Sequence, residues 1–401
     1  MIITIETRKA SLKRKIRRHL RSMGFARDEK GLLVPPDLSK DTYRALHAGH
    51  RIEKLRDSAK FLARVGDKLL PYFADGIDVN PELIRPRLEV VSSTALSGDI
   101  FRYASLFWRV PVSEGYGRRV RFLVWDDSND KLIGIFALGD AVFNLKVRDE
   151  KIGWDHLQRA KALVNMMDAY VLGAVPPYSY LLGGKLVASL LRTKEVVDVF
   201  NEKYRETTGI ISGEKKQAKL VALTTTSSLG RSSIYNRLRL VGTDYFSSIG
   251  FTSGWGHFHI PDRLFAEMRQ YLEDSGDTHS KRFLYGHGPN YRMRTIRRAL
   301  DLLGMDGNLI QHGLPREVFF CSVADNATKI LTGKNKRPVY SGLKTVEEVA
   351  ALAKDRWVIP RSERNPEYRS WVAETLKEEF RAKGDTVTAL KAVMRAADAK
   401  G

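Results

Sequence analysis

The sequence predicts an α/β (α+β) protein with a mixed-sheet core between a basic helical N-terminal region and a basic helical C-terminal region. Three observations lead to this class. Apolar residues alternate with strand periodicity in the middle of the chain, and segments with helical spacing lie between those strands. Both ends combine helical spacing with clusters of Lys and Arg. We therefore expect three regions, residues 1–95, 96–275 and 276–401.

The N-terminal region is expected to begin with a basic amphipathic helix. Leu12, Ile16 and Leu20 recur at helical spacing and predict one apolar stripe. Cations occupy the other positions, chiefly Lys13, Arg14, Arg17 and Arg18. Further along, Asn80 followed by Pro81 predicts the start of another helix, because proline is favoured at the first helical position.

The central region is expected to alternate strands and helices. The expected strands are 119–125, 131–138, 168–175, 218–227 and 251–261, and the first two form a hairpin around a polar turn. The segment "SSLGRSSIYNRL" is expected to be helical or a tight turn. In the C-terminal region, "PNYRMRTIRRALDLLGM" predicts a helix, and Thr345 with Glu348 has capping-box spacing before another.

Charge indicates the class of partner. The chain has 67 Lys and Arg against 47 Asp and Glu, a formal net charge of +20. Such an excess favours a polyanion, DNA or RNA, although a solvated basic surface remains the alternative. No apolar run approaches the roughly 20 residues of a membrane-spanning helix, so no membrane partner is expected. A single cysteine excludes an internal disulfide and, without a leader segment, suggests the cytoplasm.

Arginine clusters are the candidate nucleic-acid contacts. They are Arg118, Arg119 and Arg121 in the first hairpin strand, Arg231 and Arg237 around a serine pair, and Arg292, Arg294, Arg297 and Arg298 in the C-terminal helix, together with the cations of the first helix. Such residues bind phosphates without specifying sequence. Near the hairpin, Trp108, Tyr116 and Trp125 either stack on bases or pack in the core. Ser232 and Ser233 suit a phosphate, or belong to an ordinary capped helix.

No catalytic residue can be assigned from the sequence. It lacks a P-loop, a G-x-S-x-G elbow and an H-E-x-x-H motif, and its cluster Asp126, Asp127 and Asp130 fits a hairpin turn. No metal is predicted. His257 and His259, alternating along an expected strand, are weak candidates for ligands, with aromatic strand packing as the alternative.

The order of hairpin, helix, strand, glycine turn, helix and strand resembles the core of the acetyltransferase superfamily. In that superfamily the turn after the central strand wraps the pyrophosphate of coenzyme A. The resemblance implies that Tyr180, Gly183, Gly184 and Lys185 would bind an acetyl-coenzyme-A-like donor. The alternative is that the two glycines only let a helix pack close to a strand.

Nearly the whole chain resembles the Druantia anti-phage system protein A family. The resemblance rests on eight segments in order: "LHAGHRIEKL", "FADGIDVNPELIRPRLEVV", "SEGYGRRVRFLVWD", "SLGRSSIYNRL", "SSIGFTSGWGHFHIP", "GHGPNYRMRTIRRALDLLG", "HGLPREVF" and "RWVIPRSERNPEY". It implies a bacterial cytoplasmic defence protein that works beside other defence proteins, including a helicase.

Together these patterns predict a nucleic-acid-binding component of a bacterial anti-phage system that binds through its arginine clusters. An acyltransferase-like enzyme that modifies nucleic acid or protein is the second hypothesis, and a scaffold that docks a helicase is the third. The patterns leave DNA and RNA, single strand and duplex, and the oligomeric state open.

Overall fold

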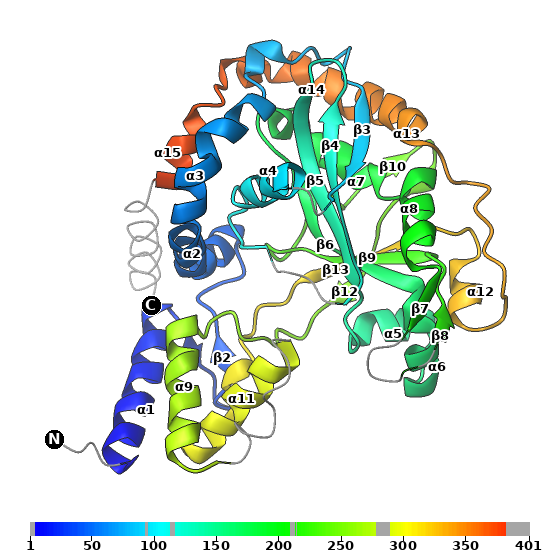
Figure 1. The fold of residues 1–401 in the computed structure, drawn as a ribbon. Coiled ribbons are helices and arrows are strands. Elements are labelled where there is room, and N and C mark those ends of the chain that lie inside the picture. Colours follow the sequence, from blue (N-terminus) through cyan, green and yellow to red (C-terminus); the bar gives the residue numbers. More distant parts are fainter. Residues whose placement is uncertain are drawn as a thin grey trace.

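A seven-stranded mixed sheet forms the centre of the computed structural model, which describes residues 5–92, 95–112, 117–208, 213, 215–277 and 289–381 (Figure 1). The strand order is β12-β13-β9-β6-β5-β4-β3. The strands are β3 (Pro86–Val90), β4 (Arg119–Asp126), β5 (Lys131–Asp140), β6 (Met166–Ala174), β9 (Ala222–Thr226), β12 (Ser247–Phe251) and β13 (Glu317–Ser322). All neighbours are antiparallel except β6 and β9, which are parallel. The expected fold class is confirmed.

Helices cover the sheet or lie beside it (Figure 1). They are α1 (Ile5–Ser22), α2 (Lys40–Asp57), α3 (Ala59–Leu69), α4 (Ala95–Ser105), α5 (Lys146–Ile152), α6 (His156–Ala162), α7 (Gly183–Leu190), α8 (Lys194–Tyr204), α9 (Asp262–Asp274), α11 (Pro289–Leu302), α12 (Ala327–Leu331), α13 (Val346–Ala353), α14 (Ile359–Arg364) and α15 (Thr375–Arg381). Short antiparallel pairs lie outside the sheet: β1 (Ala26–Arg27) with β2 (Leu33–Val34), β7 (Glu206–Thr208) with β8 (Lys215–Gln217), and β10 (Arg239–Leu240) with β11 (Thr243–Asp244). Within the described ranges, none of the helices has the length and apolar character needed to cross a bilayer.

Both faces of the sheet are covered. Along β4, Phe122 and Val124 belong to a core shared with α7, α8 and α13, whereas Leu123 and Trp125 belong to a core shared with α3, α4 and α15. Successive side chains of a strand point to opposite faces, so β4 fills two cores at once. This explains why its second half is apolar without alternation.

A second lobe lies beside the sheet and contains α1, α9 and α11 (Figure 1). Its core includes Leu12 and Ile16 of α1, Met268 of α9, and Ile296 and Leu300 of α11. Helix α9 contacts both of the others. The lobe therefore draws one helix from each of the three expected regions, and the division at residues 95 and 275 stays a prediction.

Three strands of the sheet were not expected, namely β3, β13 and β12, of which β12 shares only Phe251 with an expected strand. Strand β3 lies in the N-terminal region and β13 in the C-terminal region, and both regions had been expected to be helical. Each is a short run, of five and six residues, and such runs carry too little periodicity to separate a strand from a helix. Pairing with β4 and with β9 decides their conformation.

Two local expectations are wrong. After Asn80 the chain makes a turn, with Leu83 N donating to Asn80 O, and no helix begins there. The strand expected over 251–261 does not form: β12 covers Ser247–Phe251 and ends where that strand was expected to begin, and Ile260 N donates to His257 O in a turn. Gly254 has a φ of +70°, a conformation incompatible with an extended strand.

The crossover from β6 to β9 brings α7 close to the sheet. The two strands pair only over Met166–Asp168 and Ala222–Thr224 and then part. Helix α7 starts at Gly183, where an added Cβ would lie 2.5 Å from the carbonyl oxygen of Tyr178 and 3.1 Å from Cβ of Ala174 on β6. The packing role considered for this glycine is thus confirmed.

Gly183→Ala should lower the free energy of unfolding by about 1–3 kcal/mol, because the new methyl group overlaps backbone that cannot move independently. Gly98→Ala is the matched control. Gly98 lies inside α4 with no atom within 4 Å of an added Cβ, so alanine should stabilise the helix by about 0.5–1 kcal/mol. Urea unfolding measures both, and equal midpoints for the two variants would contradict the close approach.

Candidate nucleic-acid interface

Helix α1 has one apolar and one cationic side, as predicted. Leu12, Ile16 and Leu20 are buried in the core of the lobe. The outer face of α1 consists of Arg14, Arg17, Arg18 and Arg21, all exposed. Arg14 and Arg21 each lie three and four positions from Arg17 and Arg18, so the four side chains form a single stripe. In the described part of the chain, no carboxylate lies within ion-pair distance of this outer face.

Cations on the sides of α1 behave differently. Arg8 forms an ion pair with Asp274, and Lys15 forms one of 2.6 Å with Glu267, so both bind α9. Lys13 is half-buried, and its Nζ lies 3.9 Å from where a Cβ on Gly304 would be, just after α11. Arg8 and Lys15, on the sides of α1, thus bind α1 to α9. The arginines of the outer face remain exposed to solvent.

Arg292 and Arg298 of α11 form ion pairs within the protein. Arg292 donates to the Asp262 carboxylate and to the carbonyl oxygen of Ile260. Arg298 forms an ion pair of 2.7 Å with Asp277. Both pairs tie α11 to α9 or to the segment that follows it.

The other two arginines of α11 are exposed. Arg294 and Arg297 lie on its solvent side, and the Arg297 guanidinium lies 5.7 Å from the ring centroid of Trp255. The indole of Trp255 is itself 41% exposed. Sequence reasoning did not single out Trp255. The flanking glycines in "GWG" were the available signal, because glycines permit a close backbone approach.

Arg118 is part of the scaffold of the hairpin. Its Nε donates to Asp140 Oδ1 over 2.7 Å, and its side chain is only 11% exposed. The guanidinium also lies 5.5 and 5.8 Å from the ring centroids of Phe200 and Tyr204 on α8. Such contacts serve the packing of α8 on the sheet.

Arg119 and Arg121 are exposed on the other face of β4, which confirms the predicted alternation with Arg118. The backbone N–H of Arg119 donates to the Tyr204 hydroxyl, and that hydroxyl donates to the Arg119 carbonyl oxygen. The Arg121 guanidinium lies 5.4 Å from the Phe101 ring centroid. The two hydrogen bonds to Tyr204 hold the backbone at the start of β4, where the Arg119 and Arg121 side chains are exposed to solvent.

The serine pair forms a turn rather than a helix, so the capped-helix alternative is wrong. Arg231 and Arg237 are exposed there. The buried Glu317 carboxylate accepts from the backbone N–H of Ser232 over 3.1 Å and from the Asn236 amide over 3.2 Å. The Ser232 backbone N–H, which was considered as a donor to a phosphate, therefore donates to a carboxylate of the protein itself.

The glycine turn presents few polar groups. Tyr180 is exposed and contacts the Trp371 ring, with 5.8 Å between centroids. Gly184 faces Ile234, 3.3 Å from where its Cβ would be. The Lys185 ammonium lies 5.4 Å from the Trp357 ring centroid, and burial lowers the pKa of Lys185. Binding of an acetyl-coenzyme-A-like donor at this turn stays a prediction.

His257 and His259, the two candidates for metal ligands, lie inside the lobe. His259 is buried and donates from Nε2 to the Leu309 carbonyl oxygen over 2.7 Å, while His19 donates to the His259 carbonyl oxygen. Burial lowers the pKa of His257 and of His259 to about 4, so both are neutral at pH 7. Within the described ranges, no group of three or more His, Cys, Asp or Glu side chains is placed to hold a metal ion.

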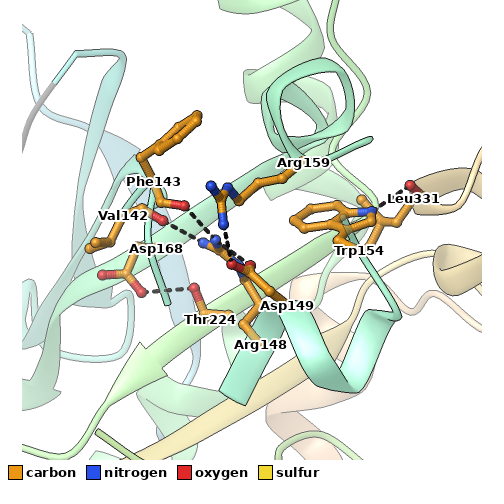
Figure 2. A network of polar contacts seen from close by, with 9 residues as sticks. All are labelled: Val142, Phe143, Arg148, Asp149, Trp154, Arg159, Asp168, Thr224 and Leu331. Carbon is orange, nitrogen blue, oxygen red and sulfur yellow. Dashed lines mark hydrogen bonds and ion pairs between the residues drawn. The ribbon is translucent and has the colours of Figure 1, made fainter. Parts of the chain in front are cut away.

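A buried polar network that the sequence did not reveal lies where β6 and β9 part (Figure 2). Arg148 is fully buried and donates to the carbonyl oxygens of Val142 and Phe143 and to Asp149 Oδ1. Arg159 donates to the other Asp149 oxygen over 2.8 Å. One carboxylate thus serves two guanidinium groups, and every nitrogen of Arg148 has an acceptor.

Asp168 is the titratable group of this region. Its Oδ1 accepts from the Thr224 hydroxyl over 2.9 Å, at the last paired position of β6 and β9. Burial raises the pKa of Asp168 to about 6, against the opposing effects of the Thr224 hydrogen bond and the Arg148 charge. A carboxyl with this pKa can exchange a proton near neutral pH. In the sequence Asp168 stood alone, because its partners come from other elements.

Comparison with known proteins supplies the family. The family model of Druantia protein DruA matches residues 37–333. The curated Druantia protein DruA of Escherichia coli (strain UMEA 4076-1) is 53% identical over 377 residues, which cover 94% of this chain and 93% of that protein. No solved structure matches the chain.

Asp168→Asn should change how stability depends on pH. The pKa of Asp168 is about 6 in the folded protein against an ordinary 3.8, so between these values the folded state binds more protons. The free energy of unfolding therefore falls as pH rises from about 4 to 6, by on the order of 3 kcal/mol, and stays low above that range. The asparagine variant should lack this fall and keep the Thr224 hydrogen bond.

The measurement is urea unfolding at pH 4, 5, 6 and 7 for the protein and both variants, with Asp198→Asn on an exposed position of α8 as the control. Histidine titration affects all three proteins alike and cancels in the differences. Parallel pH profiles for the protein and Asp168→Asn would show that Asp168 titrates normally.

Proposed function

Because the chain belongs to the family of Druantia protein DruA, and is thus a component of the Druantia anti-phage system, we propose that it supplies a nucleic-acid-binding surface to that system. Its binding is electrostatic, directed at phosphates, and independent of sequence. The outer face of α1 is the main contact.

The observation that carries this proposal is the stripe of Arg14, Arg17, Arg18 and Arg21, which has no acidic partner among the residues that the structure describes. Elsewhere in the lobe, acidic side chains neutralise arginines, as Asp274 does for Arg8 and Asp277 for Arg298. Four neighbouring guanidinium groups without acidic partners repel one another by a few tenths of a kcal/mol per pair. A polyanion relieves this repulsion and releases its own counterions on binding.

The other arginines differ in whether an ion pair within the protein holds them. Arg119, Arg121, Arg231, Arg237, Arg294 and Arg297 are exposed and extend the proposed binding surface. Arg118, Arg292 and Arg298 form ion pairs with Asp140, Asp262 and Asp277, so their loss would disturb the fold as well as binding. A helicase is the proposed partner that hydrolyses ATP, since the sequence contains no P-loop.

Replacing Arg14, Arg17 and Arg18 together by glutamine should weaken binding to nucleic acid about tenfold or more at moderate salt. It should also flatten the plot of log affinity against log salt concentration, by up to about 0.7 per lost contact on single strands and 0.9 on duplex. Glutamine preserves helix propensity, so α1 should remain folded. Fluorescence anisotropy with labelled oligonucleotides at several salt concentrations measures both effects.

The matched control replaces Arg56, Lys60 and Lys68 by glutamine. These exposed cations lie at the end of α2 and on α3, so the control has the same net charge as the α1 variant. If both triple variants lose affinity and slope equally, net charge alone explains the binding and the α1 site is refuted. If the unaltered protein binds neither DNA nor RNA, the function itself is refuted.

A second candidate function is acyl transfer. The observation that favours it is that parallel β6 and β9 separate after three pairs, and that a glycine turn and a helix start follow the end of β6. Such an opening fits the resemblance to acetyltransferases described for the sequence. The close packing of Gly183 speaks for a structural role instead.

Thermal unfolding with acetyl-coenzyme A distinguishes binding of an acyl donor from a purely structural role of the glycine turn. A donor bound with a dissociation constant of 10 μM would, at 1 mM, stabilise the protein by about 2.7 kcal/mol, a rise of several degrees in Tm. Desulfo-coenzyme A should give a similar rise, whereas AMP should not. An unchanged Tm at 1 mM donor would remove acyl transfer from consideration.

A further inference from the structure

Trp255 is unusual among the tryptophans. All six lie in the described part of the chain, and the other five are buried or half-buried. Trp125, considered above as a stacking residue, donates its Nε1–H to Glu89 and is 7% exposed, and Trp154 donates to the Leu331 carbonyl oxygen. Tyr116 lies outside the described residues. Among the six tryptophans, Trp255 alone is exposed.

The backbone holds Trp255 firmly. It forms an isolated antiparallel bridge with Gln311, and on either side Gly256 N donates to Ile310 O while His312 N donates to Gly254 O. At Gly254 a Cβ would lie 2.9 Å from Leu314 N, so the two backbones pack directly against each other. An exposed indole on such a support loses little freedom when a ligand stacks on it.

The surroundings of Trp255 are cationic and continue to α1. Arg297 lies over the indole, and its Cγ is 3.6 Å from where a Cβ on Gly307 would be. Gly307 belongs to the turn after α11 that also contains Gly304, the neighbour of Lys13 on α1. A series of near neighbours thus connects Trp255 with the helix that bears the outer arginine face.

This turn also contains acidic groups, which limit what can bind there. Asp301 and Asp306 are exposed, and Asp306 accepts from the Asn308 backbone N–H. Their charges disfavour a phosphate directly at the turn. An uncharged aromatic ring is not repelled, so the indole suits a base while the arginines suit the phosphates on either side.

We propose that Trp255, backed by Arg297, is a stacking platform for an unpaired base, and hence that the nucleic acid bound by this lobe is single-stranded. The inference rests on the proposed function and narrows its substrate class. In a duplex both faces of each base are already stacked on neighbouring bases, so no base face is free to stack on an indole at the protein surface. Stacking of one base on an aromatic side chain contributes roughly 1–3 kcal/mol.

The test compares Trp255→Ala with the unaltered protein on a labelled single strand and on its duplex, at one salt concentration. Trp255→Ala should weaken single-strand binding by about 10- to 100-fold and change duplex binding by less than about threefold. Trp255→Phe should recover most of the loss, because phenylalanine retains a stacking face. The slope of log affinity against log salt should remain unchanged, since no cation is removed.

Phe143→Ala is the matched control: Phe143 is 43% exposed and its ring contacts His156 of α6, a helix that lies away from the lobe (Figure 1). Equal losses on single strand and duplex, or no loss at all, would overturn the stacking role while leaving salt-dependent binding intact. Absence of binding by the unaltered protein would refute the proposed function itself. Retained single-strand affinity in Trp255→Ala, together with loss of a co-purifying defence protein, would reassign the indole to a protein contact.

Discussion

Burial of three aliphatic side chains determines the orientation of α1 and therefore the character of the lobe. Leu12, Ile16 and Leu20 are each at most 4% exposed, and burying such residues contributes about 1.5–3 kcal/mol apiece. The like charges along the same helix oppose folding by only about 0.2–0.5 kcal/mol per neighbouring pair. Burial wins by several kcal/mol, and the helix folds with its cations turned outward.

The same side chain serves two purposes in this protein. Where an arginine has acceptors around it, as Arg148 has two carbonyl oxygens and a carboxylate, it fixes one part of the chain to another. Where the described residues offer no acceptor, as at Arg17, the guanidinium is exposed to solvent and can bind an anion. The formal charge of +20 therefore overstates the available cationic surface, and the location of acidic partners decides which arginines matter for binding.

Patterns that depend on near neighbours in sequence were predictable. The amphipathic α1, the β4–β5 hairpin and the capping box of α13 each arise from residues a few positions apart. Features that depend on distant partners were not. Glu317 accepts a hydrogen bond from Ser232, which is 85 positions away in the sequence. No local sequence pattern predicts that a carboxylate binds this turn. The exposure of Trp255 likewise follows from its bridge to Gln311, and Asp168 acquires its environment from the packing of three strands.

The composition of the lobe has a consequence for synthesis. Lys15 and its partner Glu267 are 252 residues apart, so α1 leaves the ribosome well before α9 exists. At about 5–20 residues per second, this interval lasts about 10–50 s. During that time the three aliphatic side chains of α1 cannot be buried, because their partners in α9 and α11 do not yet exist. The nascent chain therefore exposes an amphipathic, cationic segment close to messenger RNA. These aliphatic side chains are buried only after α9 and α11 have been synthesised and the lobe has closed.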